Sequence, residues 1–106
     1  MNYYCTAFDE RVSVIPKVAA WEIIYQKVFK GTPDKQIKEE GLFENSECCS
    51  EFARTLGKAR IRAKELLKDP RTNRTGILIR KHKAALGEDG LSVDWTWTGN
   101  EEEVTQ

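Results

Sequence analysis

The sequence predicts an α+β fold, in which a small antiparallel sheet made of an N-terminal strand and a C-terminal hairpin carries about three helices on one face. Aromatic and small residues between 2 and 8, and a regular alternation of apolar and polar residues over 91–98, are typical of strands. Helical spacing and helix caps mark the region between them. The 106 residues fit a single domain, which we expect to span 1–98, followed by an acidic flexible tail over 99–106.

Two helices are expected in the first half of the chain. Apolar residues recur at three- and four-residue steps over 17–30, which indicates a helix that ends at Gly31. A second, short helix should begin at Thr32 as the N-cap, with Pro33 in its first turn, and end at Gly41.

The third and longest helix is expected from residue 46 to residue 67. Its apolar side chains gather in one sector of a helical wheel, while Arg54, Lys58 and Arg62 lie on the opposite side. Arg60 falls inside the apolar sector. It must therefore reach the surface, pair with a carboxylate, or face a gap that a partner fills.

The strands are expected at the two ends of the chain. Residues 2–15 form either one strand interrupted at 9–10 or two short strands around a turn. Residues 76–83 and 91–98 should form an antiparallel hairpin, because the turn-forming residues 88–90 stand between them. Trp95 and Trp97 share the apolar face of the second hairpin strand and are expected in the core; the alternative is a stacking platform for nucleic-acid bases.

Charge is divided unevenly along a chain whose formal net charge is zero. Residues 54–83 contain eleven basic residues and two acidic ones, a net charge of +9, and the remainder of the chain therefore carries −9. A positive surface built by this segment would attract phosphates or an acidic protein surface. The competing interpretation is a solvated surface whose charges are neutralised within the molecule. The candidate binding residues are Arg54, Lys58, Arg62, Arg71, Arg74, Arg80, Lys81 and Lys83.

An acidic surface is the second candidate for docking. Its side chains would imitate phosphates and occupy a basic groove of a partner. It would consist of Glu39, Glu40, Glu44 and Glu47.

Catalytic and metal chemistry have little support in the sequence. His82 is the lone histidine, and no nucleophile or Gly-rich phosphate motif accompanies it. The adjacent Cys48 and Cys49 do not have the spacing of zinc ligands; Cys49 is expected in the core and Cys48 near the surface. We expect a protein that is not an enzyme and has no metal site and no cofactor.

The three cysteines and the absence of a leader-like or spanning apolar stretch favour a cytoplasmic protein without membrane contact. We expect a small interaction protein, an inhibitor or regulator that docks on a protein or nucleoprotein complex that handles nucleic acid, as the anti-defence inhibitors of mobile elements do. The alternative is a regulator that binds DNA or RNA directly through residues 54–83. A free sheet edge would also permit a homodimer.

Overall fold

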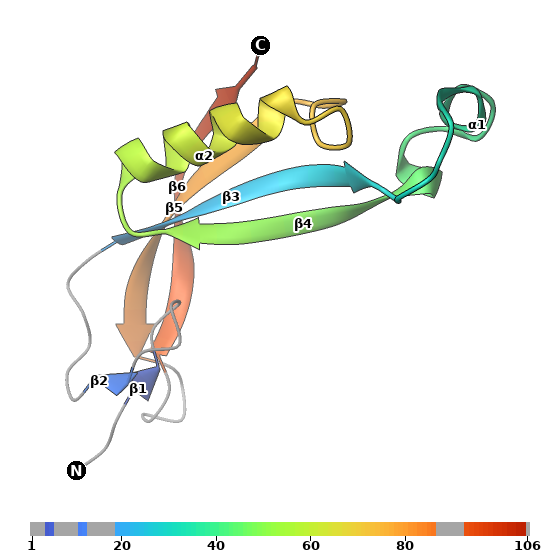
Figure 1. Ribbon diagram of the computed structural model, residues 1–106. Coiled ribbons are helices and arrows are strands. Elements are labelled where there is room, and N and C mark those ends of the chain that lie inside the picture. The colour runs from blue at the N-terminus through green and yellow to red at the C-terminus, as the bar shows by residue number, and fades with distance from the viewer. Residues whose placement is uncertain (1–3, 6–10, 13–18, 87–92, 106) are drawn as a thin grey trace.

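A four-stranded antiparallel sheet with one helix lying across one of its faces forms the body of the molecule (Figure 1). The computed structural model describes residues 4–5, 11–12, 19–86 and 93–105. The sheet consists of β3 (Ala19–Val28), β4 (Ser46–Ala53), β5 (Ile77–Leu86) and β6 (Val93–Val104) in the order β4-β3-β5-β6. The covering helix is α2 (Leu56–Lys68). The expected α+β class is therefore confirmed, but only α2 packs on a face of the sheet.

The two described strands near the N-terminus form a sheet of their own. The strands β1 (Tyr4–Cys5) and β2 (Arg11–Val12) pair with each other as a separate two-stranded sheet. Of the two arrangements considered for residues 2–15, two short strands is the correct one. The expectation that an N-terminal strand would pair with the C-terminal hairpin was wrong, because β3 takes that position beside β5.

The helix expected over 17–30 is wrong, since most of this segment is β3, an inner strand of the sheet. Trp21, Ile23 and Tyr25 alternate with polar or half-buried neighbours and face α2. Ile24, between Ile23 and Tyr25, lies on the opposite face of the sheet. β-Branched and aromatic side chains favour a pleated strand, and burial with a period of two outweighs the three- and four-residue spacing.

The long helix expected over 46–67 is also wrong, because β4 and α2 share this segment. All of β4 pairs with β3, from Val28 opposite Ser46 to Trp21 opposite Ala53. The helix begins only at Leu56, where the Thr55 hydroxyl accepts a hydrogen bond of 3.1 Å from the backbone N–H of Lys58. A threonine N-cap satisfies one of the free amides of the first turn, which fixes the start of α2 at this point.

The short helix in the middle of the chain is confirmed as α1 (Asp34–Glu40), and it ends at Gly41, whose φ of 101° favours glycine. The expected N-cap at Thr32 is wrong, because Pro33 occupies the N-cap position and the helix begins at Asp34. It is followed by the 3₁₀ turn η1 (Phe43–Asn45). Together they form the far end of the β3–β4 pair, away from the start of α2 (Figure 1). The structure thus has two α-helices where three were expected.

The C-terminal hairpin is confirmed and is longer than expected. Residues 99–104, assigned to a flexible tail, are the second half of β6 and pair with β5 up to Val104 opposite Ile77. The pairing shifts between Arg80 and His82, where β6 carries a bulge at Gly99 with a φ of 92°. Trp97 lies beside this bulge and is 43% exposed, so its expected place in the core is wrong. The turn expected at 88–90 lies outside the described residues.

The core lies between α2 and the sheet. Ala59 and Ala63 of α2 are fully buried, and their small side chains allow the helix backbone to come close to Ile23, Ile77 and Ile79. Leu66 and Leu67 extend this contact, and each fully buried side chain of that size contributes about 1.5–3 kcal/mol. At the end of α2, the buried Thr72 hydroxyl donates a hydrogen bond to the carbonyl of Leu66. Neither helix of the described residues is long and apolar enough to cross a membrane.

The close packing of α2 against the sheet can be tested by enlarging one of its buried side chains. Ala63→Leu should lower the free energy of unfolding by about 1–3 kcal/mol, because the added carbons have no room between helix and sheet. Lys64→Leu, at an exposed position of the same helix, should change it by less than about 0.5 kcal/mol. Urea denaturation followed by circular dichroism measures both, and equal effects of the two changes would contradict the close packing.

Candidate interaction surface

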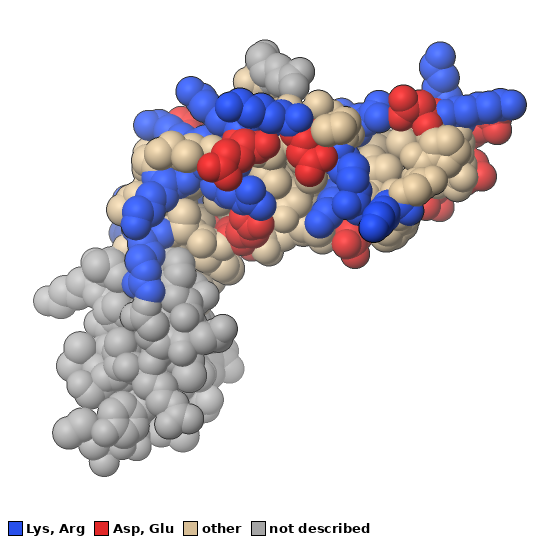
Figure 2. Space-filling model, viewed as in Figure 1, with Lys and Arg blue, Asp and Glu red and all other residues tan. Residues whose placement is uncertain are grey.

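Part of the charge of the basic segment is neutralised by carboxylates from other parts of the chain. Among the described residues, four of its eleven basic side chains, all of them arginines, form an ion pair with a partner outside residues 54–83. Basic and acidic side chains are accordingly interleaved on the face that carries α2 (Figure 2). The pairs are Arg60–Glu102 at 2.7 Å, Arg62–Glu51 at 2.8 Å, Arg74–Asp34 at 2.5 Å and Arg80–Glu101 at 2.8 Å.

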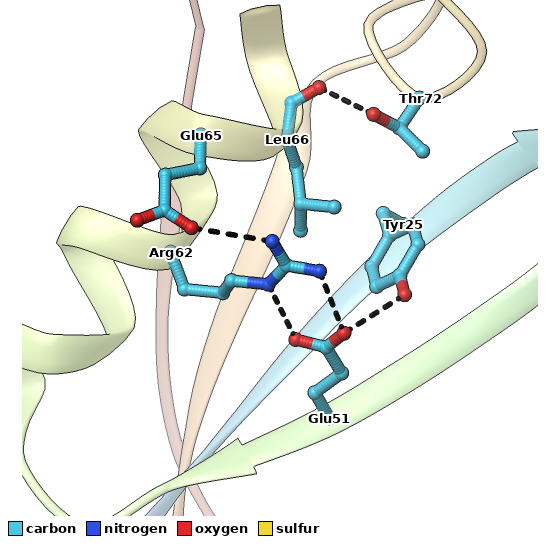
Figure 3. Close-up of polar contacts among 6 residues, drawn as sticks. All are labelled: Tyr25, Glu51, Arg62, Glu65, Leu66 and Thr72. Carbon is cyan, nitrogen blue, oxygen red and sulfur yellow. Dashed lines mark hydrogen bonds and ion pairs between the residues drawn. The ribbon is translucent and has the colours of Figure 1, made fainter. Parts of the chain in front are cut away.

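Arg62 points toward β4 rather than away from the molecule. Its guanidinium donates two hydrogen bonds, of 2.8 and 3.0 Å, to the Glu51 carboxylate, and a third of 3.2 Å to Glu65 (Figure 3). The Tyr25 hydroxyl donates to the same Glu51 carboxylate at 3.1 Å. Hydrogen bonds from Arg62 lower the pKa of Glu51 below its ordinary value, and burial raises that of Tyr25. Arg62 therefore joins α2 to the sheet and is poorly placed to bind a partner.

The remaining arginines of the predicted surface differ in their surroundings. Arg71 is half-buried and donates from Nε to the Val28 carbonyl at 3.0 Å, which ties the loop after α2 to the end of β3. Arg74 is exposed and reaches α1, far along the molecule from the start of α2. Arg54 is exposed at the end of β4.

The basic residues of β5 also differ from one another. The Arg80 guanidinium lies 4.5 Å from the centre of the Trp97 ring, which partly covers the face proposed as a base-stacking platform. The Lys81 ammonium lies 5.9 Å from the centre of the Trp21 ring, and Lys83 is exposed. The predicted residues are thus spread over several faces of the sheet and helix.

One face of α2 retains positive charge, and we call it the lysine face. It consists of Lys58, Ile61, Lys64 and Lys68, which recur at three- and four-residue steps and are all exposed. Among the described residues, none of the three lysines has a carboxylate within ion-pair distance. Ile61, at the centre of this face, is 63% exposed.

Ile61 did not enter the sequence-based site. It lies outside the apolar sector formed by the buried residues of α2, and that displacement is the signal that could have identified it. An isoleucine on the solvent side of a helix adds nothing to the core and has lysines three residues before and after it. Of the predicted binding residues, only Lys58 belongs to the lysine face.

A cavity of about 260 Å³ lies at the sheet side of the first turns of α2. Trp21, Leu56 and Ile79 form its apolar floor, and Lys81 and Asn100 stand at its rim. The Glu102 carboxylate that borders it is already held by Arg60 in two hydrogen bonds of 2.7 and 2.9 Å. Glu101, which also lines the cavity, is held by Arg80 at 2.8 Å, so the apolar floor is the part that can accept a side chain of a partner.

The acidic residues proposed as an alternative surface lie together at the α1 end of the molecule. Glu39 and Glu40 are on α1, Glu44 is in η1 and Glu47 is near the start of β4, and all are exposed. Lysines of α1 interrupt this surface, and one pairs with Glu39 at 3.9 Å. These basic neighbours dilute the negative field of the acidic residues.

His82 and the cysteines are built into the sheet. His82 Nε2 lies 3.2 Å from a Glu22 oxygen, and its ring packs edge-on against Phe52. Cys49 packs against the core and Cys48 is exposed, as expected, although on a strand rather than on a helix. Within the described part of the chain, no three His, Cys, Asp or Glu side chains gather as metal ligands.

Comparisons with protein-family models, with curated proteins and with solved structures found no match to this chain.

The contact of Arg62 with Glu51 predicts a specific response to acid. A carboxyl with a lowered pKa stabilises the folded state above its ordinary pKa of 4.5, and this contribution is lost as the pH falls through that value to the lower folded pKa. Glu51→Gln should cost at most about 1 kcal/mol at neutral pH and flatten the loss of stability between about pH 5 and pH 3. Denaturant titrations at a series of pH values measure this. Glu39→Gln on α1 is the control, and a wild-type acid response in Glu51→Gln would contradict a stabilising role for the pair.

Proposed function

We propose that this chain is a non-enzymatic interaction protein that docks on an acidic surface of a protein partner through the lysine face of α2. The observation that carries the proposal is Ile61, 63% exposed at the centre of three lysines without carboxylate partners among the described residues. An apolar side chain surrounded by charged residues is the arrangement of a binding hot spot. The central side chain is desolvated on binding, and the charged residues at the rim orient the partner. An inhibitor or regulator of nucleic-acid-handling machinery is the class of protein that we infer.

The surrounding ion pairs support this choice of surface. Arg60 and Arg62 flank the lysine face, and both are already engaged with Glu102 and Glu51. A partner would have to break those pairs to use the arginines, but the lysines are available at no such cost. The cavity beside Leu56 adds space for a second apolar side chain of the partner.

Direct binding of DNA or RNA is the competing function, and Ile61 separates the two. Phosphates are contacted by Lys and Arg side chains, so nucleic-acid binding would depend on the lysines and strongly on salt. An isoleucine contributes little to a contact with phosphates. A protein partner, in contrast, would bury Ile61 together with the lysine stems.

The experiment is affinity purification with the tagged chain from a lysate of the source cells, with and without nuclease. We expect proteins that are retained by the wild type after nuclease treatment and lost with Ile61→Asp. Measured with the purified partner, Ile61→Asp should weaken binding by about 30-fold or more, as for a hot-spot side chain. The control is Phe43→Asp, because Phe43 is also exposed, at 73%, but lies at the α1 end of the molecule.

Two results would overturn the proposal. One is a partner retained equally by the wild type and by Ile61→Asp. The other is binding of a labelled DNA duplex or RNA strand that is lost in a Lys58→Ala, Lys64→Ala, Lys68→Ala triple variant but unchanged in Ile61→Asp. The second result would establish the nucleic-acid binder instead.

A further inference from the structure

The two edges of the four-stranded sheet differ in how they are protected. The β6 edge carries the bulge at Gly99 and three consecutive glutamates, Glu101–Glu103, and both features discourage pairing with another strand. The β4 edge has eight residues in regular register with β3, without a bulge, a proline or a lysine. Among the described residues no strand lies on its outer side, and Glu47, Cys48 and Ser50 are exposed.

The backbone groups that point outward from β4 follow from one hydrogen bond. One residue beyond the ladder, the N–H of Phe29 donates to the carbonyl of the opposing Asn45 at 3.0 Å, which places this pair in phase with the hydrogen-bonded pairs of the β3–β4 ladder. The N–H of the neighbouring Val28 accordingly points away from β4 and donates to the carbonyl of Arg71 at 2.8 Å. Such pairs recur at every second residue of an antiparallel ladder. The odd-numbered residues of β4 therefore direct their N–H and C=O groups to β3. The even-numbered ones direct theirs away from the sheet; they are Ser46, Cys48, Ser50 and Phe52.

We propose that a second copy of this chain pairs with β4 along this edge, antiparallel and about a two-fold axis at Ser50. In an antiparallel sheet, the side chains of directly opposing residues lie on the same face. The two-fold axis must therefore pass through a pair formed by one residue and the same residue of the second copy, and not between two such pairs. An axis at Cys48 overlaps only residues 46–50 of the strand. An axis at Cys49 places Glu47 opposite Glu51 twice, and like charges directly opposite each other destabilise a pair of strands.

An axis at Ser50 avoids both difficulties. It overlaps residues 47–53, with Glu47 opposite Ala53, Glu51 opposite Cys49, and Cys48 opposite Phe52. The outward amides and carbonyls of Cys48, Ser50 and Phe52 then meet those of the second copy in hydrogen-bonded pairs. An axis further along the strand shortens the overlap again and brings the two Glu51 side chains together.

A second β4 is also a better occupant than the β6 edge of another copy. Pairing β4 with β6 would bring Glu47 and Glu51 close to Glu101–Glu103. It would also leave a free edge at each end, which leads to open-ended assembly, whereas the two-fold pair is closed. The two-fold axis is perpendicular to the sheet, so both copies of α2 lie on the same side. The dimer therefore does not depend on the proposed role of the lysine face.

The register can be tested by disulfide trapping, because only a residue on the two-fold axis lies opposite itself. Across a hydrogen-bonded pair the Cα atoms are about 5.5 Å apart, which suits a disulfide. Three single-cysteine proteins are compared, all with Cys5→Ser: one retains Cys48, one retains Cys49, and one has Cys48→Ser, Cys49→Ser and Ser50→Cys. Under copper–phenanthroline oxidation we expect a covalent dimer with Ser50→Cys. Preferential trapping through Cys48 or Cys49 would overturn the register.

The dimer itself is tested by sedimentation equilibrium of the wild type from low to high micromolar concentration. We expect a reversible monomer–dimer equilibrium, and a wild type that remains monomeric throughout would overturn the proposal. Ser50→Lys should give a folded monomer, because two lysines would meet at the axis, and so should Ser50→Glu. An equimolar mixture of the two should restore the dimer. A mixture that stays monomeric beside a dimeric wild type would place the interface elsewhere.

Discussion

The approach of α2 to the sheet through two alanines is the contact on which the rest of the structure depends. Ala59 and Ala63 are fully buried in the cluster that contains Ile23, Ile77 and Ile79. With the helix seated on these small side chains, the arginines on its two flanks reach both edge strands. Arg60 contacts Glu102 of β6, and Arg62 contacts Glu51 of β4. One helix thus contacts both edges of the four-stranded sheet.

This arrangement determines which charges remain for a partner. Arginine forms bidentate hydrogen bonds with carboxylates, and Arg60 and Arg62 each form such a pair within the molecule. The lysines of α2 have no such contact with a carboxylate of the described residues, and they surround an exposed isoleucine. Four of the eleven basic residues of 54–83 thus hold carboxylates within the fold. The lysine face, which is proposed for docking, contains three of the others.

The parts of the fold that could be predicted are those with local signals. Gly41 marks the end of α1, and the alternation after residue 91 marks β6. Residues 19–28 satisfy both a helical and a strand pattern, because apolar residues occupy adjacent positions such as Ile23 and Ile24. Only pairing with β4 and β5, which are distant in sequence, decides between the two patterns.

The candidate site was predictable in composition but not in geometry. The sequence contains the excess of basic residues in 54–83, but it does not show that Arg74 meets Asp34 or that Arg80 meets Glu101. Those contacts join residues 40 and 21 positions apart. The expected helix was too long, but its apolar sector was placed correctly. Ile61 was missed because only the residues of that sector, which are buried, were considered.

The helix α1 contributes less to the core than the rest of the described structure does. None of the residues of α1 is buried, and Asp34, which links it to Arg74, has a side chain that is 78% exposed. Asn45 of η1, in contrast, is buried and accepts a hydrogen bond from Gln36. Opening of α1 therefore removes little apolar area from the core, and its backbone amides should exchange with solvent long before those of β3 or α2. A segment with these properties tolerates sequence drift, and a fluorophore or an affinity tag attached at an exposed residue of α1 would lie away from the lysine face.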